Sequence, residues 1–176
     1  EANDVIASIS KVTSDIVRTV APDVEEYYVP HAVDSTIFTE RTEEEVQQVL
    51  NGNEVLRNRT VFFWNNRNAR RKQSGSLLYW FRDFLELEEV NRDEVCLFLH
   101  TDPNDPHGQP LRYLIDQLDF QEGEVVLSSV DLVPEQMAVL YNIADCTVNI
   151  SDAEGFGLAT LESLSCGTPI IVNMTG

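Results

Sequence analysis

Basic residues are scarce in this sequence, which contains only two lysines, Lys11 and Lys72. Lysine and arginine together number 12, aspartate and glutamate number 30, and the formal net charge is −18 at pH 7. Proteins that bind nucleic acids or anionic membranes through charge are generally basic, because both of those surfaces are negative. The composition therefore argues against nucleic acid or membrane as the main partner.

Long hydrophobic runs are also missing: no segment approaches the roughly 20 apolar residues of a membrane-spanning helix, and no signal peptide is visible. The chain begins with Glu1 instead of methionine, so we expect an excised or processed fragment. Cysteine is rare, and the three cysteines, Cys96, Cys146 and Cys166, are widely spaced in apolar runs. This pattern predicts buried free thiols in a reducing compartment, the cytoplasm, in place of disulfides or a zinc site.

The sequence does contain enough apolar residues for one folded domain. Hydrophobic residues make up 43% of the 176 positions, which excludes a disordered chain, and the length suits one domain or one domain with part of another. Short runs rich in β-branched and aromatic residues alternate with stretches of helical spacing, a pattern typical of βαβ units. We therefore predict an α/β fold, a Rossmann-like three-layer αβα arrangement with a mainly parallel sheet.

The expected elements are short and follow one another along the whole chain. Strands are predicted at Val5–Ile9, Glu26–Val29, Thr60–Trp64, Glu94–Leu99, Glu124–Leu127, Cys146–Ile150 and Pro169–Val172. Helices are predicted near Val12–Val20, Glu43–Leu50, Ser76–Leu87, Leu111–Leu118, Pro134–Ile143 and Leu158–Ser165. The segment Pro30–Glu40 is interpreted as a linker, and the prolines and glycine of Thr101–Gln109 predict a long acidic loop.

Ligands of open parallel sheets bind beyond the carboxyl ends of the strands, so functional residues are expected in the segments that follow the strands. The first unusual segment follows Thr60–Trp64. Between residues 57 and 82 there is no acid but there are seven basic residues, namely Arg57, Arg59, Arg67, Arg70, Arg71, Lys72 and Arg82. Such a concentration of positive charge in an acidic chain indicates a site for a compact anion such as a diphosphate. The alternative is a solvated basic loop that pairs with neighbouring carboxylates.

The second unusual segment follows Cys146–Ile150. Gly155 and Gly157 stand just before a predicted helix, where the backbone can approach a phosphate and the free N–H groups of the first turn favour an anion. Glu154 precedes this turn and Glu162 follows eight residues later, a spacing that allows both to face one cleft. The alternative is that the glycines serve only a tight turn and the glutamates lie on the surface.

Two other strand ends carry weaker signals. The segment after Glu124–Leu127 contains Val130 and Leu132, which offer an apolar border for a nucleobase, although ordinary helix entry is the commoner role of such a segment. His100 ends another strand; a lone histidine there is interpreted as structural, and no second ligand at suitable spacing supports a metal site.

These residues resemble the donor-binding half of the family-4 glycosyltransferases, retaining enzymes with the two-domain GT-B fold. The family signature of two glutamates separated by seven residues is matched by Glu154-Gly155-Phe156-Gly157-Leu158-Ala159-Thr160-Leu161-Glu162, which Ser163 to Pro169 extends. A second signature, an arginine and a lysine five positions apart after a strand, is matched by Arg67 and Lys72. The segments Leu140–Asp145 and Val29–Asp34 also resemble family segments, so the resemblance covers essentially the whole chain.

The resemblance implies a role for each matched residue. Arg67 and Lys72 would bind the donor diphosphate together with the N–H groups of Gly155, Phe156, Gly157, Leu158 and Ala159. Glu162 would accept the ribose hydroxyls, Glu154 would bind the transferred sugar near the reacting carbon, and Val130 and Leu132 would border the base. Glu154, Arg67 and Lys72 are thus the implied catalytic residues, and no metal or other cofactor is required.

The resemblance also implies a domain division and a function. Residues 1–38 match the end of the acceptor-side domain and the linker, and residues 39–176 match the donor-binding domain without its last strand and helices. The implied function is transfer of a hexose from a UDP- or GDP-hexose to an acceptor that the sequence does not identify. The alternative is a nucleotide or nucleotide-sugar binding module without autonomous transferase activity, which holds its ligand or at most hydrolyses the donor. A homo-oligomer or a separate acceptor-domain partner would suit a chain with an uncovered face. A structural protein whose basic loop docks an acidic partner is a third reading.

Overall fold

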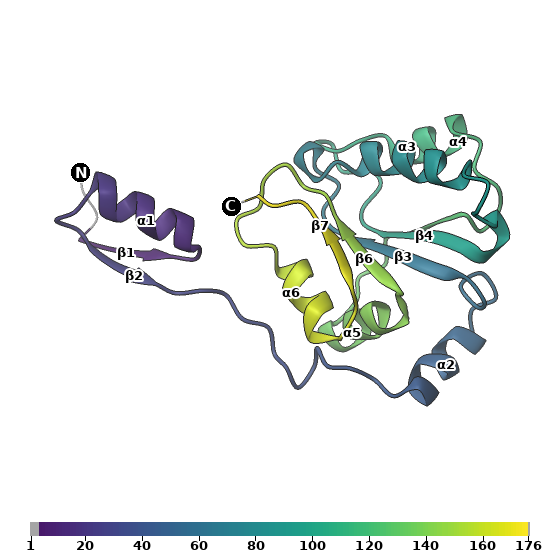
Figure 1. Cartoon of the computed structure of the whole chain (residues 1–176), viewed down its shortest axis with the longest axis horizontal. Helices are drawn as coiled ribbons and strands as arrows, with labels where there is room; N and C mark the ends of the chain where they lie inside the picture. The colour runs from purple at the N-terminus through teal and green to yellow at the C-terminus, as the bar shows by residue number, and fades with distance from the viewer. Residues whose placement is uncertain (1–3, 176) are drawn as a thin grey trace.

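The computed structural model describes residues 4–175, which form a small N-terminal unit and a larger α/β body (Figure 1). The small unit consists of β1 (Val5–Ser8), α1 (Lys11–Val20) and β2 (Glu25–Tyr28). The strands of the main body are β3 (Thr60–Asn65), β4 (Val95–His100), β5 (Val125–Ser128), β6 (Cys146–Asn149) and β7 (Ile170–Val172). Its helices are α2 (Glu43–Asn51), α3 (Ser74–Leu85), α4 (Leu111–Gln117), α5 (Pro134–Ile143) and α6 (Leu158–Ser165). Within residues 4–175, no helix has the length and apolar character needed to cross a membrane.

The main sheet confirms the predicted α/β fold. All five strands are parallel, and their order across the sheet is β5-β4-β3-β6-β7. The chain therefore starts in the middle at β3, runs outward to β4 and β5, and then crosses to β6 and β7 on the other side of β3. The carboxyl ends of β3 and β6 lie next to each other at this reversal, which is where open parallel sheets bind their ligands.

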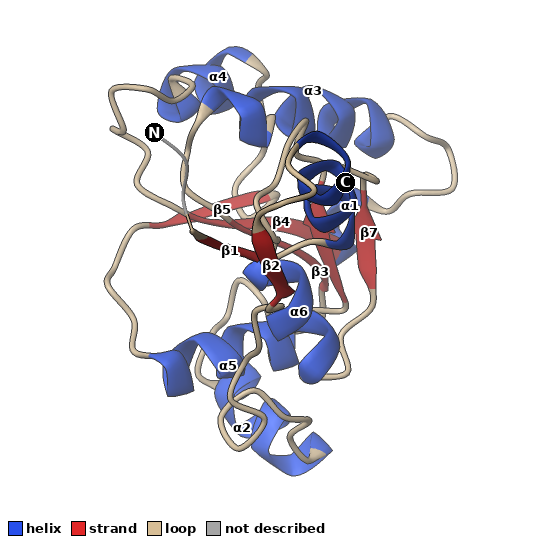
Figure 2. Ribbon diagram, turned by 90° about the vertical axis from the view of Figure 1, so that its left-hand side faces the viewer, coloured by secondary structure: helices blue, strands red, loops and turns tan. Residues whose placement is uncertain are grey.

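Helices cover both faces of the main sheet, with α3 and α4 on one face and α5 and α6 on the other (Figures 1 and 2). The side chains of β4 show why two faces are needed: Cys96 and Phe98 pack on the α5 side, and Leu97 and Leu99 pack on the α3 side. Successive residues of a strand point to opposite faces, so a strand apolar at every position must be covered twice.

Small differences from the predicted elements have local causes. The predicted helix Ser76–Leu87 begins at Ser74 and ends at Leu85, because a 3-10 turn at Arg70–Lys72 ends on Gln73, whose left-handed φ of 58° redirects the chain into α3. The three cysteines are free thiols, but only Cys96 and Cys166 are buried, whereas Cys146 is half-buried at the start of β6.

The N-terminal unit buries few of its own side chains. In the described part of this unit, residues 4–28, only Ser8 and Ser14 are buried, and apolar side chains such as Ile16 and Val20 are exposed. Two strands and one helix are too few to enclose a core. The segment after β2, interpreted as a linker, ends against the main body, where Phe38 is 7% exposed and Ser165 Oγ donates a 2.5 Å hydrogen bond to its carbonyl oxygen.

Glu124, which precedes β5 at the amino end of the sheet, provides a test of stability away from the strand ends. Its buried carboxylate accepts hydrogen bonds of 2.6 and 2.9 Å from Arg92. Burial, the largest single cause, raises the pKa of Glu124, but the hydrogen bonds from Arg92 and the Gln121 N–H, together with the charges of Arg92 and Arg59, lower it below its ordinary value. We expect Glu124→Gln to lower the free energy of unfolding by about 3 kcal/mol at pH 7, because it breaks a buried ion pair.

The loss of unfolding free energy in Glu124→Gln should depend on pH with a definite sign. A carboxylate whose folded pKa is depressed stabilises the fold above its unfolded pKa of about 4.3, and this contribution is lost as the pH falls through the folded value. Urea unfolding between pH 3 and pH 7 should therefore show the difference in unfolding free energy between wild type and Glu124→Gln shrinking toward the acidic end. Glu122→Gln, at an exposed position nearby, is the control and should leave stability unchanged. A cost that stays constant down to pH 3 would contradict the ion-pair explanation.

Candidate functional site at the strand ends

Two loops meet at the point where the strand order reverses. The loop after β3 carries Arg67 to Lys72, and the loop after β6 carries Asp152 to Gly157. The Asp152 N–H donates to the carbonyl oxygen of Arg71 at 2.8 Å, and Arg71 Nη1 donates to the Ala153 carbonyl at 2.5 Å. Backbone and side-chain hydrogen bonds therefore hold the basic loop and the glycine-containing loop together.

An ion pair between Lys72 and Glu154 lies at the centre of this junction. Lys72 Nζ is 2.5 Å from Glu154 Oε1 and also donates to Asn66 Oδ1 at 2.6 Å. The two side chains are only 10% and 13% exposed, so the pair is largely shielded from water. Burial, the largest single cause, raises the pKa of Glu154, but the hydrogen bonds of Lys72, Ser151 and Arg71, together with the charge of Lys72, lower that pKa below its ordinary value. Glu154 is therefore held as a carboxylate.

Arg67 is paired with a different acid. Its Nε donates to Asp105 Oδ2 at 2.5 Å and its Nη2 to Asp105 Oδ1 at 3.2 Å. Asp105 belongs to the acidic loop after β4, and the Arg67 hydrogen bond is the largest cause that lowers the pKa of this carboxyl. The Arg67 side chain is 64% exposed, in contrast to that of Lys72. One edge of the guanidinium fork is thus occupied by a carboxylate in a position open to solvent.

The acidic loop is fixed against the basic loop by a fully buried asparagine. Asn68 donates through Nδ2 to the Gln109 carbonyl at 2.8 Å, and its Oδ1 accepts from the Gln109 N–H at 3.1 Å and from Ser74 Oγ at 2.8 Å. Gly108 lies so close that a Cβ atom added to it would be 2.2 Å from the Asn68 carbonyl oxygen. Asp105 is consequently presented to Arg67 by a loop that is itself held in place.

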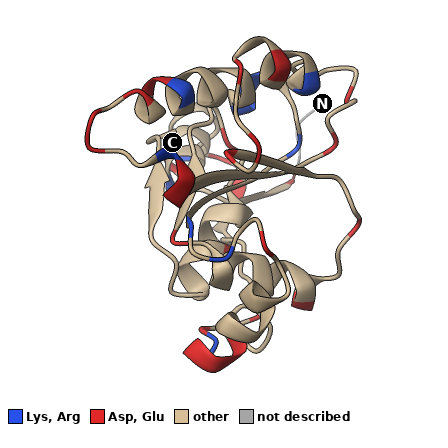
Figure 3. Cartoon of the chain, turned by 90° about the vertical axis from the view of Figure 1, so that its right-hand side faces the viewer, with Lys and Arg blue, Asp and Glu red and all other residues tan. Residues whose placement is uncertain are grey.

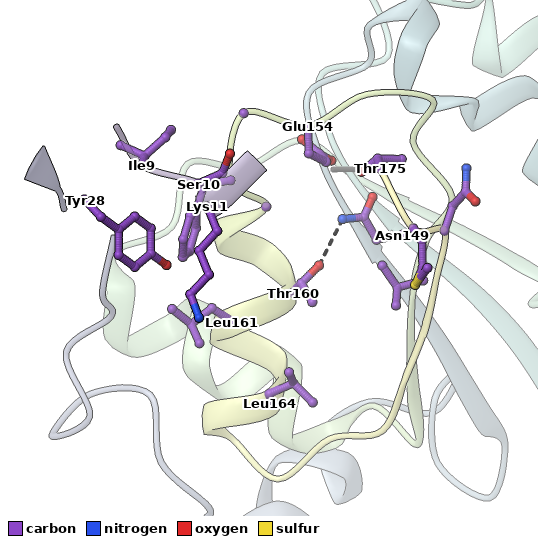
Figure 4. Close-up of a pocket in the computed structure, with 16 residues that line it drawn as sticks. Ile9, Ser10, Lys11, Tyr28, Asn149, Glu154, Thr160, Leu161, Leu164 and Thr175 are labelled. Atoms are coloured by element: carbon purple, nitrogen blue, oxygen red, sulfur yellow. Dashed lines mark hydrogen bonds between the residues drawn. The ribbon is translucent and has the colours of Figure 1, made fainter. Parts of the chain in front are cut away.

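The glycine-containing loop leads into the N-terminus of α6 and lines a cleft (Figure 4). Gly157 has a φ of 87°, a left-handed conformation that turns the chain into the helix. The cleft has a volume of about 440 Å³ and lies between the N-terminal unit, represented by Lys11 and Tyr28, and the segment from Glu154 to Gly157. The first turn of α6 offers its N–H groups at this edge, an arrangement that suits an anion.

The second glutamate of the motif has a different environment from the first. Glu162 does not line the cleft that Glu154 lines, because the α6 residues that face it, such as Thr160 and Leu164, lie on another side of the helix. Instead Glu162 Oε2 accepts a 2.6 Å hydrogen bond from the hydroxyl of Tyr141 on α5. The two glutamates therefore have different hydrogen-bond partners, Lys72 for Glu154 and Tyr141 on α5 for Glu162.

The basic run predicted as one site is divided by the fold. Arg59 donates to the Val95 carbonyl at 3.0 Å beside the start of β4, and Arg82 pairs with Glu86 at 3.3 Å at the end of α3. Only the segment from Arg67 to Lys72 lies at the carboxyl end of β3. Figure 3 shows acidic residues on helices and loops on both sides of the sheet. The alternative reading is thus correct in part, because Arg67, Arg71 and Lys72 do pair with neighbouring carboxylates.

The remaining predicted positions have simple environments. Val130 is 61% exposed, and the apolar side chains of Val130 and Leu132 have no polar group for a hydrogen bond to the junction. Their segment does lead into α5, as expected for helix entry. His100 Nδ1 lies 3.2 Å from Ser128 Oγ, and burial lowers the pKa of this histidine, in agreement with a structural role.

Three residues of the junction were not anticipated as parts of a site: Asp105, Tyr141 and Asn65. The signal for Asp105 was the acidic loop after the strand next to β3, since neighbouring parallel strands bring their following loops together. A tyrosine inside an otherwise apolar helix was the signal for Tyr141, because a buried hydroxyl requires a hydrogen-bond partner.

The pair between Arg67 and Asp105 leads to a prediction about anion binding. Carboxylates and phosphates use the same fork of an arginine, so Asp105 competes with an incoming diphosphate. We expect Asp105→Asn to increase the affinity for UDP by about 3-fold at low salt, the scale of an exposed ion pair. Calorimetric titration measures this, with Asp102→Asn in the same loop as a control that removes a charge without freeing Arg67. Unchanged or weaker binding in Asp105→Asn would mean that Asp105 orients Arg67 instead of competing for it.

Comparison with known proteins identifies the class to which this fold and these loops belong. The family model of the glycosyl transferases group 1 matches residues 88–176, which is half of the chain. The chain therefore belongs to the group 1 glycosyltransferase family. Solved structures agree: the chain superposes over its whole length on sucrose-phosphate synthase from Thermosynechococcus elongatus, covering 42% of that chain, with a TM-score of 0.80 and 21% identity. This similarity shows the GT-B type of fold.

Particular relatives are similar over different parts of the chain. A D-inositol 3-phosphate glycosyltransferase from Acidothermus cellulolyticus is 31% identical over 95 residues, which are 53% of this chain and 21% of that protein. An alpha-monoglucosyldiacylglycerol synthase from Streptococcus pneumoniae is 24% identical over 166 residues, 93% of this chain and 36% of that protein. The crystal structure of Anabaena Alr3699/HepE in complex with UDP and glucose is also similar, with 14% identity and a TM-score of 0.79. The matched region is 98% of this chain and 45% of the Anabaena chain. The chain thus spans less than half the length of these relatives.

Proposed function

We propose that this chain provides the donor-binding part of a family-4 retaining glycosyltransferase, which transfers a hexose from a UDP- or GDP-hexose. The observation that carries the proposal is the junction of Lys72 and Glu154, which joins the basic loop after β3 to the glycine-containing loop after β6. Cations, free N–H groups and a carboxylate meet there at the reversal of the strand order. This combination suits a sugar attached to a diphosphate better than a simple anion.

In this proposal the leaving diphosphate is bound by Arg67, Lys72 and the backbone N–H groups from Gly155 to Ala159. The two loops that carry most of these groups are joined before substrate arrives, because Arg71 is hydrogen-bonded to Asp152 and Ala153. Donors aimed at the place where negative charge develops lower the barrier for bond cleavage. Three kinds of positive group in one place can stabilise the charge that forms on the diphosphate as the sugar leaves.

The two glutamates have separate roles in the proposal. Glu154 lines the cleft and is held as a carboxylate, so it accepts hydrogen bonds from hydroxyls of the transferred hexose beside the reacting carbon. Glu162 accepts the ribose hydroxyls, and Val130 and Leu132 border the base. The complex of Anabaena Alr3699/HepE with UDP and glucose supports a uridine nucleotide as the ligand to test first.

The domain division is part of the same proposal. Residues 1–38 represent the acceptor side and the linker, and residues 39–176 represent the donor-binding domain. The cleft between Lys11 on α1 and Glu154 in the glycine-containing loop is where the donor sugar and the acceptor would meet. Placement in the cytoplasm stays a prediction from the free thiols, and the chemistry of the acceptor is left to experiment.

Titration calorimetry tests the proposal directly. The chain is titrated without divalent metal with UDP, GDP and ADP, and with the glucose and mannose forms of the first two. We expect selective binding of one diphosphate that is lost in Arg67→Ala and in Glu162→Ala and kept in Arg57→Ala, an exposed residue before β3. No binding of any nucleotide, or equal loss in all three variants, would contradict the proposed donor site.

Turnover needs a separate measurement, because binding alone does not distinguish a transferase from a binding module. Release of the diphosphate from the selected nucleotide sugar is measured with and without candidate acceptors. Release that increases with an acceptor supports transfer, whereas slow release independent of acceptor supports the alternative of a module that only hydrolyses its donor. Binding without any release supports a module that only holds the nucleotide sugar.

A further inference from the structure

A buried tyrosine connects helix α6 with the end of strand β3, the two elements next to the loops that the proposed function assigns to the nucleotide. Tyr141 on α5 is fully buried, and its ring packs edge-on against Phe63 with the ring centroids 5.4 Å apart. Its hydroxyl lies 2.6 Å from Glu162 Oε2 on α6 and 2.9 Å from Asn65 Nδ2 at the end of β3. Asn65 is the residue from which the basic loop departs, so a single hydroxyl touches both elements.

The direction of these hydrogen bonds follows from the chemistry of the groups. An amide nitrogen only donates, so Asn65 donates to the tyrosine oxygen and the single hydroxyl proton is directed to Glu162 Oε2. Burial, and then the negative charge of Glu162, raise the pKa of Tyr141, so the phenol remains a donor at all ordinary pH values. One carboxylate oxygen of Glu162 is therefore permanently engaged, and the other makes no hydrogen bond within the described part of the chain.

We propose that Tyr141 is a positioning residue for nucleotide recognition: it holds Oε2 of Glu162 so that Oε1 is presented to the ribose hydroxyls. This inference rests on the proposed function, in which Glu162 accepts those hydroxyls. A free glutamate side chain has several rotatable bonds and must be ordered when it binds a ligand. Fixing the carboxylate through Tyr141 beforehand removes that cost from binding and favours ligands whose hydroxyls match the fixed oxygen.

The test compares ligands that differ only in the ribose. Affinities for UDP, 2′-deoxy-UDP and 3′-deoxy-UDP are measured by calorimetry for the wild type and for Tyr141→Phe, which keeps the aromatic ring and its contact with Phe63. For the wild type we expect UDP to bind about 10-fold tighter than the weaker deoxy analogue, the scale of a hydrogen bond to a charged acceptor. In Tyr141→Phe we expect this preference to fall to about 2-fold, with little change in the affinity for the deoxy analogue.

The ratio of the affinities for UDP and for its deoxy analogues distinguishes a positioning role of Tyr141 from a merely structural one. A general loosening of the fold would weaken the binding of all three nucleotides equally and leave the ratio unchanged. Tyr113→Phe, at an exposed position on α4, is the matched control and should keep the wild-type preference. In the Glu162→Ala background, adding Tyr141→Phe should cause no further loss of the preference, because both changes act through one carboxylate.

Two contradictory results have different meanings. If Glu162→Ala abolishes the ribose preference but Tyr141→Phe retains it, the positioning role is overturned while the proposed donor site stands. If the wild type binds no nucleotide, or if Glu162→Ala leaves the preference intact, the assignment of Glu162 to the ribose fails and the role of Tyr141 fails with it. Thermal unfolding of each variant confirms that the measured protein is folded.

Discussion

Lys72→Met is expected to lower the affinity for UDP about 100-fold, or beyond detection, because it removes a charged hydrogen-bond donor from the centre of the proposed diphosphate site. Methionine keeps the apolar stem of the side chain, so packing along the stem is largely maintained. The change also leaves Glu154, a side chain only 13% exposed, without its nearest cation. With Lys72 gone, burial dominates and the pKa of Glu154 rises, while any remaining negative charge on it repels the diphosphate.

Calorimetry with UDP, together with thermal unfolding, checks this expectation. The control is Arg57→Met, which removes the same charge from the same basic run but at the other end of β3, and it should leave UDP affinity within about 2-fold, because an exposed charge this distant is screened by salt. Equal losses in both variants would show that only the overall charge of the run matters. Unchanged affinity in Lys72→Met would remove Lys72 from the site and leave its pair with Glu154 as a purely structural contact.

The arrangement of the main body could be predicted from the sequence because it depends on local patterns. Short apolar runs rich in β-branched and aromatic residues, such as Thr60–Trp64, favour strands buried on both faces, and the helical stretches between them favour a return to a parallel neighbour. The element ends are less determined. The start of α3 depended on the backbone conformation of Gln73, which its residue type does not reveal.

The two loops of the candidate site could be predicted from the sequence, but the carboxylates that pair with Arg67 and Lys72 could not. Arg67 and Lys72 share one loop, yet Arg67 pairs with a residue 38 positions away and Lys72 with one 82 positions away. Which carboxylate approaches which cation depends on the order of the strands, because β4 and β6 flank β3 on opposite sides. Sequence spacing carries no information on that order, and the same limit explains why seven basic residues were assigned to one site.

This dependence on neighbouring loops makes Gly108→Ala the second change with a large expected effect. Its Cβ would be 2.2 Å from the carbonyl oxygen of Asn68 and 2.4 Å from Asn68 Nδ2, far inside contact distance. Because one of these atoms is backbone and the Asn68 side chain is fully buried, neither yields easily. We expect a loss of about 3 kcal/mol in the free energy of unfolding, at the upper end of the cost of overpacking, and a fall in Tm of roughly 6–12 °C.

Gly108→Ala should also change the candidate site, because the clash between its Cβ and Asn68 is removed only if the acidic loop moves away from the loop after β3. That movement breaks the hydrogen bonds from Asn68 to Gln109 and withdraws Asp105 from Arg67. Calorimetric unfolding and UDP titration are carried out on Gly108→Ala and on the control Gly52→Ala, whose Cβ would meet its nearest neighbour at an ordinary 3.4 Å. Full stability in Gly108→Ala would show that the two loops are not held together as the structure describes. A destabilised variant in which Asp105→Asn still increases UDP affinity would show instead that Asp105 reaches Arg67 without the support of Asn68.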